Sequence, residues 1–192
     1  LNIPGQDQDI TLTQAVLGGI GSAAGQGGGG AGGRVAVVSA SAYNEGLQAI
    51  VDQLNDDTYF NFTATLILPS EADTLEELQA YDAVVIGGTG NDSNQFSVFA
   101  GALRSYVEGG GGLITTGWGI FASGGLYGTT RSDFDAAVPV NTNGGYNYYS
   151  GTMVTPVGSH PIVEGLSSFS VSSYTEFPGS SPGVDAGATT LA

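Results

Sequence analysis

The sequence predicts an α/β fold in which a doubly wound, mainly parallel sheet lies between two layers of helices (a three-layer α/β/α arrangement). Short runs rich in β-branched residues, such as Arg34–Ala40 (RVAVVSA), are typical of strands buried on both faces, as inside a parallel sheet. Segments with helical periodicity separate these runs. Strands that alternate with helices in this way form right-handed crossovers in one parallel sheet. The chain has 192 residues, the length of one domain plus some linker.

The first half of the sheet begins with Arg34–Ala40. In Glu45–Asn55 the apolar residues recur at the spacing of one helical face, and Asn44 is a suitable N-cap. Phe62–Leu68 predicts the second strand. A capping-box pattern at Thr74 predicts that a short helix begins there.

The second half of the sheet contains the longest predicted helix. Ala83–Ile86 predicts the third strand, Asn94–Glu108 the helix, and Leu113–Thr116 the fourth strand. Open sheets of this kind place their functional groups beyond the carboxyl ends of the strands. The segments at those ends, where we expect a site, are Ser39–Tyr43, Gly87–Asp92 and Gly117–Phe121.

After Trp118 the regular alternation of strands and helices ends. Gly124–Ser150 is rich in Gly, Asn, Ser and Tyr, a composition that favours turns and irregular structure. Thr152–Val157 predicts a strand, and Phe169–Tyr174 and Ala188–Leu191 predict antiparallel edge strands. We therefore expect an irregular, Gly/Asn/Tyr-rich C-terminal part attached to the sheet.

The first 33 residues differ from the rest. Ile10–Ile20 is a short apolar-periodic stretch, and the run that follows, residues 25–33, is almost entirely glycine, the composition of a flexible linker. The sequence thus predicts an N-terminal arm over residues 1–33 and an α/β domain over residues 34–192. An arm of this kind is expected to pack on a neighbouring subunit.

The charge balance excludes some partners. The chain has 18 acidic and 3 basic residues, a net charge of −15, and no lysine. Such a surface repels nucleic acids and anionic membranes, and the apolar runs are too short for membrane insertion. Few charges and many small polar residues are typical of secreted and cell-surface proteins, so we expect that location. No signal-peptide pattern opens the chain, so the export signal is expected upstream or already removed.

The chain contains no cysteine. This excludes disulfides, thiolate metal sites and cysteine nucleophiles together. The sequence indicates no cofactor, and the single metal hypothesis is calcium at paired carboxylates such as Asp133 and Asp135. A solvated acidic surface is the interpretation we favour for these pairs.

Three segments in order resemble a known family: Asp82–Gly88, Tyr106–Ile114 and His160–Leu166. The resemblance is to the class I glutamine amidotransferase-like superfamily, in particular its ThuA-like (trehalose-utilisation) branch, over about residues 34–177. It implies a flavodoxin-like fold. In the amidotransferases of this superfamily a cysteine follows the strand equivalent to Leu113–Thr116, and a His and a Glu complete a triad.

This sequence departs from the family at the nucleophile. Trp118 stands at or next to that turn, and an indole has no nucleophilic heteroatom, so the amidotransferase reaction cannot be carried over. The chain also stops at Ala192, before the further strands that family members usually have. We expect either a fragment of a longer protein or a neighbour that supplies the missing edge.

Two single residues are the first candidates for a site. Trp118, the only tryptophan, is either a stacking platform for a sugar or a plug that fills the vacated pocket, and we favour the plug. His160, the only histidine, is either an acid/base group with Glu164 or Glu176 or a cap for the turn at Pro161. We favour the cap.

The remaining candidates are ligand-binding residues. Gly88 and Thr89 precede the longest helix and are suited either to bind an anion or to form a tight turn, which we favour because the chain is acidic. Tyr148, with neighbouring tyrosines, either forms an adaptable binding surface or seals a loop onto the sheet. The sequence leaves these two alternatives equal.

The function we predict is a non-catalytic structural or interaction module of a secreted or cell-surface assembly. It would contact a protein partner, or itself, through the N-terminal arm and the C-terminal edge. The alternative is a carbohydrate-active enzyme or a carbohydrate-binding domain of the ThuA-like type, with Gly88, Trp118, His160 and Glu176 around one pocket.

Overall fold

A computed structural model describes residues 32–39, 45–58, 62–87, 95–115, 120, 126–140, 146–149, 152–171, 175–178 and 184–191. Within them, one four-stranded parallel sheet has the strand order β2-β1-β3-β4. Its strands are β1 (Arg34–Val38), β2 (Thr63–Ile67), β3 (Ala83–Ile86) and β4 (Gly112–Thr115). This order is that of a flavodoxin-like sheet, so the predicted doubly wound α/β fold is confirmed.

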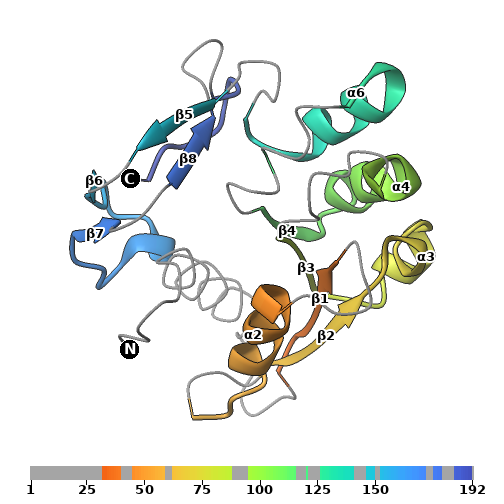
Figure 1. The fold of residues 1–192 in the computed structure, drawn as a ribbon, viewed down its shortest axis with the longest axis horizontal. Helices are drawn as coiled ribbons and strands as arrows, with labels where there is room; N and C mark the ends of the chain where they lie inside the picture. Colours follow the sequence, from red (N-terminus) through yellow and green to blue (C-terminus); the bar gives the residue numbers. More distant parts are fainter. Residues whose placement is uncertain are drawn as a thin grey trace.

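Helices cover both faces of the sheet. They are α2 (Glu45–Leu54), α3 (Leu75–Leu78), α4 (Phe96–Glu108) and α6 (Gly128–Ala137). In Figure 1, α3, α4 and α6 follow one another along one face, whereas α2 lies on the other. The step from β1 to β2 runs opposite to the later steps, and right-handed crossovers therefore place its helix on the opposite face.

Alternation along β1 builds two hydrophobic cores. Ala36 and Val38 contribute to the core under α3, α4 and α6, whereas Val35 and Val37 contribute to the core under α2. All four of these residues are buried. The unbroken β-branched run was therefore a correct indication of a strand with no solvent-facing side.

Helix α6 is an element that the sequence analysis did not predict, because it falls in a segment expected to be irregular. Its sequence, GTTRSDFDAA, has few strong helix formers. Phe134 is fully buried, and its ring meets that of Phe96 of α4 edge-on, with centroids 4.9 Å apart and planes at 82°. Contact with α4 thus stabilises a helix that local propensity does not favour.

The predicted start of the short helix α3 is confirmed. Thr74 Oγ1 accepts a hydrogen bond from Glu77 N–H at 3.3 Å, and the Glu77 carboxylate accepts one from Thr74 N–H at 3.1 Å. The Thr74 hydroxyl also donates to Glu77 Oε2 at 2.9 Å and lowers the pKa of that carboxyl. A 3₁₀ turn, η1 (Pro69–Glu71), precedes this helix.

The C-terminal part forms two small antiparallel sheets, apart from the parallel sheet in Figure 1. Strand β5 (Tyr146–Tyr149) pairs with β8 (Thr175–Pro178), and β6 (Thr152–Val154) pairs with β7 (Phe169–Val171). The strand predicted over Thr152–Val157 is confirmed in shorter form as β6, and the strand predicted over Phe169–Tyr174 is confirmed over its described residues as β7. Strands β5 and β8 were not predicted.

The strand predicted over Ala188–Leu191 is wrong, since this segment is irregular. Its contact with the rest of the chain includes a backbone hydrogen bond of 2.8 Å from Val157 N–H to Leu191 O. This hydrogen bond pairs one N–H with one C=O and does not continue as the repeated bonds of a β-ladder.

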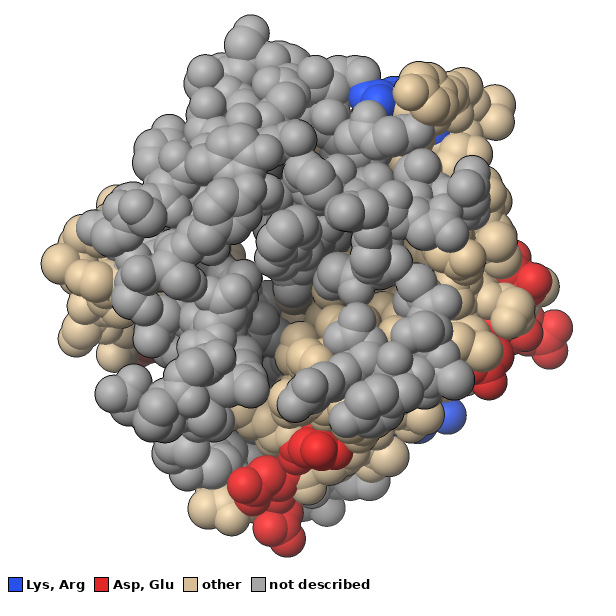
Figure 2. Space-filling view, in the orientation of Figure 1, with Lys and Arg blue, Asp and Glu red and all other residues tan. Residues whose placement is uncertain are grey.

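Acidic side chains gather on the side of η1 and α3 (Figure 2). Glu71, Asp73 and Glu76 are exposed there, which agrees with the strongly negative charge of the chain. Among the residues that the structure describes, no helix is both long and apolar enough to cross a membrane.

Candidate functional site

The carboxyl ends of β1 and β3 mark the point where the strand order reverses, and open α/β sheets hold ligands at this point. Ser39, directly after β1, is fully buried, and its N–H donates to Ile67 O at 2.9 Å. Gly87 directly follows β3 and is also buried. The backbone at this edge is therefore held within the core.

Leu47, in the first turn of α2, packs directly on Gly87. A Cβ built on Gly87 would collide with the Leu47 side chain. Because Gly87 lacks a Cβ, the amino-terminal turn of α2 lies against the end of β3. The glycine at position 87 is thus explained by its packing against Leu47, and this role does not require a ligand.

Three predicted ligand-binding residues, Gly88, Thr89 and Trp118, lie outside the residues that the structure describes. The strands that lead into them are described. Ile86 of β3 and Thr115 of β4 are register partners in the parallel sheet. The chain therefore enters both predicted segments from neighbouring strand ends, as the sequence analysis expected.

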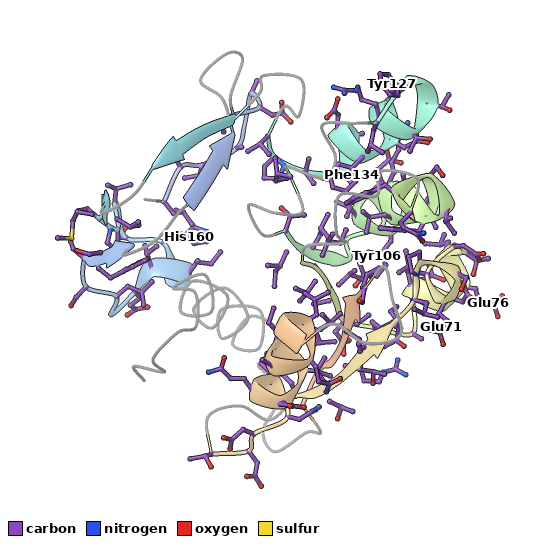
Figure 3. All side chains as sticks on the ribbon, viewed as in Figure 1. Glu71, Glu76, Tyr106, Tyr127, Phe134 and His160 are labelled. Carbon is purple, nitrogen blue, oxygen red and sulfur yellow. The ribbon has the colours of Figure 1, made fainter. Side chains whose placement is uncertain are left out.

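His160 is exposed and caps a local turn (Figure 3). Its Nδ1 accepts a hydrogen bond from Ile162 N–H at 3.2 Å, and its carbonyl accepts one from Val163 N–H at 3.0 Å. The backbone bond closes the 3₁₀ turn η4 (Pro161–Val163), and the side-chain bond caps it. An Nδ1 that accepts a hydrogen bond is unprotonated, so the neutral ring carries its proton on Nε2.

Glu164 and Glu176, the two predicted acid/base partners of His160, occupy different positions in the fold. Glu164 is exposed, and within the described part of the chain no ion pair joins it to His160. Glu176 belongs to β8, where its backbone pairs with that of Tyr148 of β5. The side chains of Tyr148 and Glu176 lie outside what the structure describes.

A shallow hollow of about 400 Å³ lies beside His160. Its other lining residues are Val157, Gly158, Ser159, Thr189, Thr190 and Leu191. Hydroxyl groups and one imidazole stand beside two apolar side chains, a mixture that suits a small polar ligand. The hydroxyls lack a described basic partner, so the hollow shows no activated nucleophile within the described residues.

The two carboxylates proposed for calcium do not act as a pair. Asp133 Oδ1 lies 3.1 Å from Arg104 Nη1, and Arg104 Nε also contacts Glu108 Oε1 at 2.8 Å. Side chains two positions apart on a helix, such as Asp133 and Asp135, do not share a face. Among the described residues, no three His, Asp or Glu side chains converge as metal ligands. Asp133 thus joins α6 to α4 through Arg104.

Gly111, one glycine of the run after α4, is explained by Tyr106. Its ring fills the position that a Cβ on Gly111 would need, and its hydroxyl donates to Tyr81 O at 3.1 Å. Burial of the ring, together with the nearby Asp82 carboxylate, raises the pKa of the Tyr106 hydroxyl above its usual value. This tyrosine was not among the predicted site residues, although it begins a motif on which the family resemblance rests.

No family model, curated protein or solved structure matches the chain. The resemblance to the amidotransferase-like superfamily therefore stays a prediction.

Proposed function

We propose that this chain is a non-catalytic structural or interaction module of a secreted or cell-surface assembly. The observation that carries the proposal is the hydrogen bond from Ile162 N–H to His160 Nδ1. The only imidazole of the chain is used to fix a turn, and the chain has no cysteine. The two side chains best suited to nucleophilic and base catalysis are thus absent or occupied.

Composition indicates the kind of partner. A net charge of −15 without a single lysine disfavours self-association through charged surfaces and favours neutral or basic partner surfaces. In this proposal the N-terminal arm (residues 1–33) and the C-terminal edge make the contacts with a protein partner or another copy. The composition also supports location outside the cell.

Sedimentation velocity tests the proposal by comparing the full chain with a version that lacks residues 1–31. This deletion leaves every described strand and helix intact. We expect the full chain to associate with itself or with an extracellular partner, and the shortened chain to lose that association. A full chain that stays monomeric and binds no partner would contradict the proposal.

The hollow beside His160 supports carbohydrate binding as a second function, because hydroxyl and imidazole groups line it beside apolar surface. A glycan array probed with the full chain and with Ser159→Ala, His160→Ala and Trp118→Ala variants tests this alternative. Glycan binding lost in the Ser159 and His160 variants would support a site in the hollow. Loss only in the Trp118 variant would instead support a site at the strand ends.

A further inference from the structure

Strand β2 forms one edge of the described parallel sheet, and β4 forms the other. Thr63 and Ile67 make backbone hydrogen bonds on the β1 side of β2, at 3.0 and 2.9 Å. Successive residues of a strand direct their backbone groups to opposite sides. Ala64 and Leu66 therefore direct their N–H and C=O groups away from β1, toward the edge.

The side chain of Asn55 satisfies both backbone groups of Ala64. Asn55 Nδ2 donates to Ala64 O at 3.0 Å, and Ala64 N–H donates to Asn55 Oδ1 at 2.8 Å. The carboxamide thus makes the two bonds that a neighbouring strand would make at this position. Asn55 directly follows α2, and its own N–H donates to Val51 O at 3.0 Å, so the helix end holds it in place.

We propose that Asn55 is an edge-blocking residue that prevents β2 from pairing with β2 of a second copy of this chain. Exposed edges template strand addition, and proteins need a device that closes them. Here the device is a single carboxamide bound at Ala64, the second residue of a five-residue strand. This inference is independent of the proposed function, which concerns other surfaces.

A second copy is the occupant whose own β2 matches the outward backbone groups of this edge. In an antiparallel β2–β2 pair, Ala64 of each copy would face Leu66 of the other, and both residues present their N–H and C=O outward. Two such pairs give four hydrogen bonds related by a twofold axis at Thr65. The exposed Thr65 side chains would then form a favourable Thr–Thr pair across the axis.

The negative charge near this edge, like Asn55, opposes pairing between two copies. Asp56 and Asp57 follow Asn55 and are exposed, and the whole chain carries −15. Two copies that meet at this edge repel each other at low salt, and added salt screens this repulsion. Pairing is therefore expected to be strongest when the carboxamide is removed and the ionic strength is high.

Sedimentation equilibrium of Asn55→Ala at high ionic strength tests the proposal. The substitution places a better helix former at a position whose N–H makes a helical backbone bond. Recovery of the two Ala64 bonds between copies predicts self-association about tenfold to a hundredfold tighter than that of the native chain. Association through any other surface is common to both proteins, so it can lower the measured ratio but cannot produce an increase.

The matched control is Asn55→Ala combined with Leu66→Pro. The Leu66 N–H points to the edge, so proline costs no bond to β1 but blocks pairing, and edge strands tolerate proline in this position. The double variant should return to the association constant of the native chain. An unchanged association constant in Asn55→Ala, or a gain that survives Leu66→Pro, would overturn the proposal.

A cross-link gives a second readout. Because the chain has no cysteine, Thr65→Cys introduces a single thiol at the proposed twofold axis. Non-hydrogen-bonded antiparallel pairs bring Cα atoms to about 4.5 Å, within the range of a disulfide. Under mild oxidation we expect dimers when Thr65→Cys is combined with Asn55→Ala or Asn55→Ser, and monomers from Thr65→Cys alone. If the combined variants fold but stay monomeric, Asn55 does not block pairing at this edge. If neither combined variant folds, the role of Asn55 is not confined to the edge. Either result would overturn the proposal.

Discussion

The side chain of Leu47 lies where a Cβ on Gly87 would have to be. Leu47 is in the first turn of α2 and is buried, and Gly87 directly follows β3. The contact therefore joins α2, the helix after β1, to the end of β3, at the point where the strand order of the sheet reverses. A side chain at Gly87 would therefore have to displace the side chain of Leu47.

Gly87→Ala is expected to lower the free energy of unfolding by about 1–3 kcal/mol, because the added methyl overpacks a filled core. Leu47→Ala is expected to cost about 2–5 kcal/mol by leaving a cavity. In the double variant the new methyl has space, so the combined loss should be smaller than the sum of the two. Urea unfolding of the three variants measures this coupling.

Gly101→Ala serves as the control for this series. Gly101 is exposed in the middle of α4, and the nearest atom to its added Cβ is Asp133 Oδ2 at 3.7 Å, an ordinary contact. Alanine favours a helix interior over glycine, so stability should rise by about 0.5–1 kcal/mol. Equal losses at Gly87 and Gly101 would show that the contact with Leu47 is not the cause.

Tyr106→Phe should make stability less sensitive to alkaline pH. The pKa of the Tyr106 hydroxyl is raised in the folded chain by burial and by Asp82. A raised pKa contributes stability that is complete below the unfolded value of about 10 and is lost as pH rises through the folded value. The native chain should therefore lose more stability than Tyr106→Phe above about pH 10.

Urea unfolding between pH 8 and 11 measures this difference. At pH 8 the variant should be less stable by about 0.5–1.5 kcal/mol, because it lacks the hydrogen bond to Tyr81 O. The two stability curves should converge as the pH rises. Parallel curves over the whole range would contradict the assignment of this titration to Tyr106.

Arg104→Gln should loosen the contact between α4 and α6. The guanidinium lies 3.1 Å from Asp133 Oδ1, and the carboxylates of Glu108 and Asp133 raise the pKa of Arg104. The pair is partly exposed, so the loss in melting temperature should be small and should shrink as salt is added. Asp133→Asn should add little to Arg104→Gln if the two residues act as one pair, and thermal unfolding of both variants checks this.

The sheet was readable from the sequence because its strands are buried on both faces. Ala83–Ile86 was predicted with its observed bounds, and β1 and α4 differ by a few residues at their ends. The runs of apolar residues in these elements indicate by themselves that the elements are buried. The sequence of helix α6 contains no such local signal, since the burial of Phe134 depends on Phe96, a residue 38 positions earlier in the chain (134 − 96).

The candidate site was predictable in part. The cap formed by His160 follows from a histidine directly before a proline turn, and the structure shows that bond. The pairing of Asp133 with Arg104 was not predictable, because the two residues are 29 positions apart and meet only when α6 packs on α4. The role of Asn55 had a weak local signal, an asparagine that ends a helix shortly before an edge strand.

The most direct test of the central claim, that His160 is structural, uses His160→Asn. The Asn Oδ1 takes the place of Nδ1 and accepts from Ile162 N–H, so the turn should remain while the imidazole is lost. We predict that this variant keeps the native melting temperature and partner binding, that His160→Ala loses less than about 1 kcal/mol, and that none of the three proteins turns over carbohydrate substrates. Carbohydrate turnover by the native chain that is abolished in His160→Asn, with the fold intact, would contradict the account.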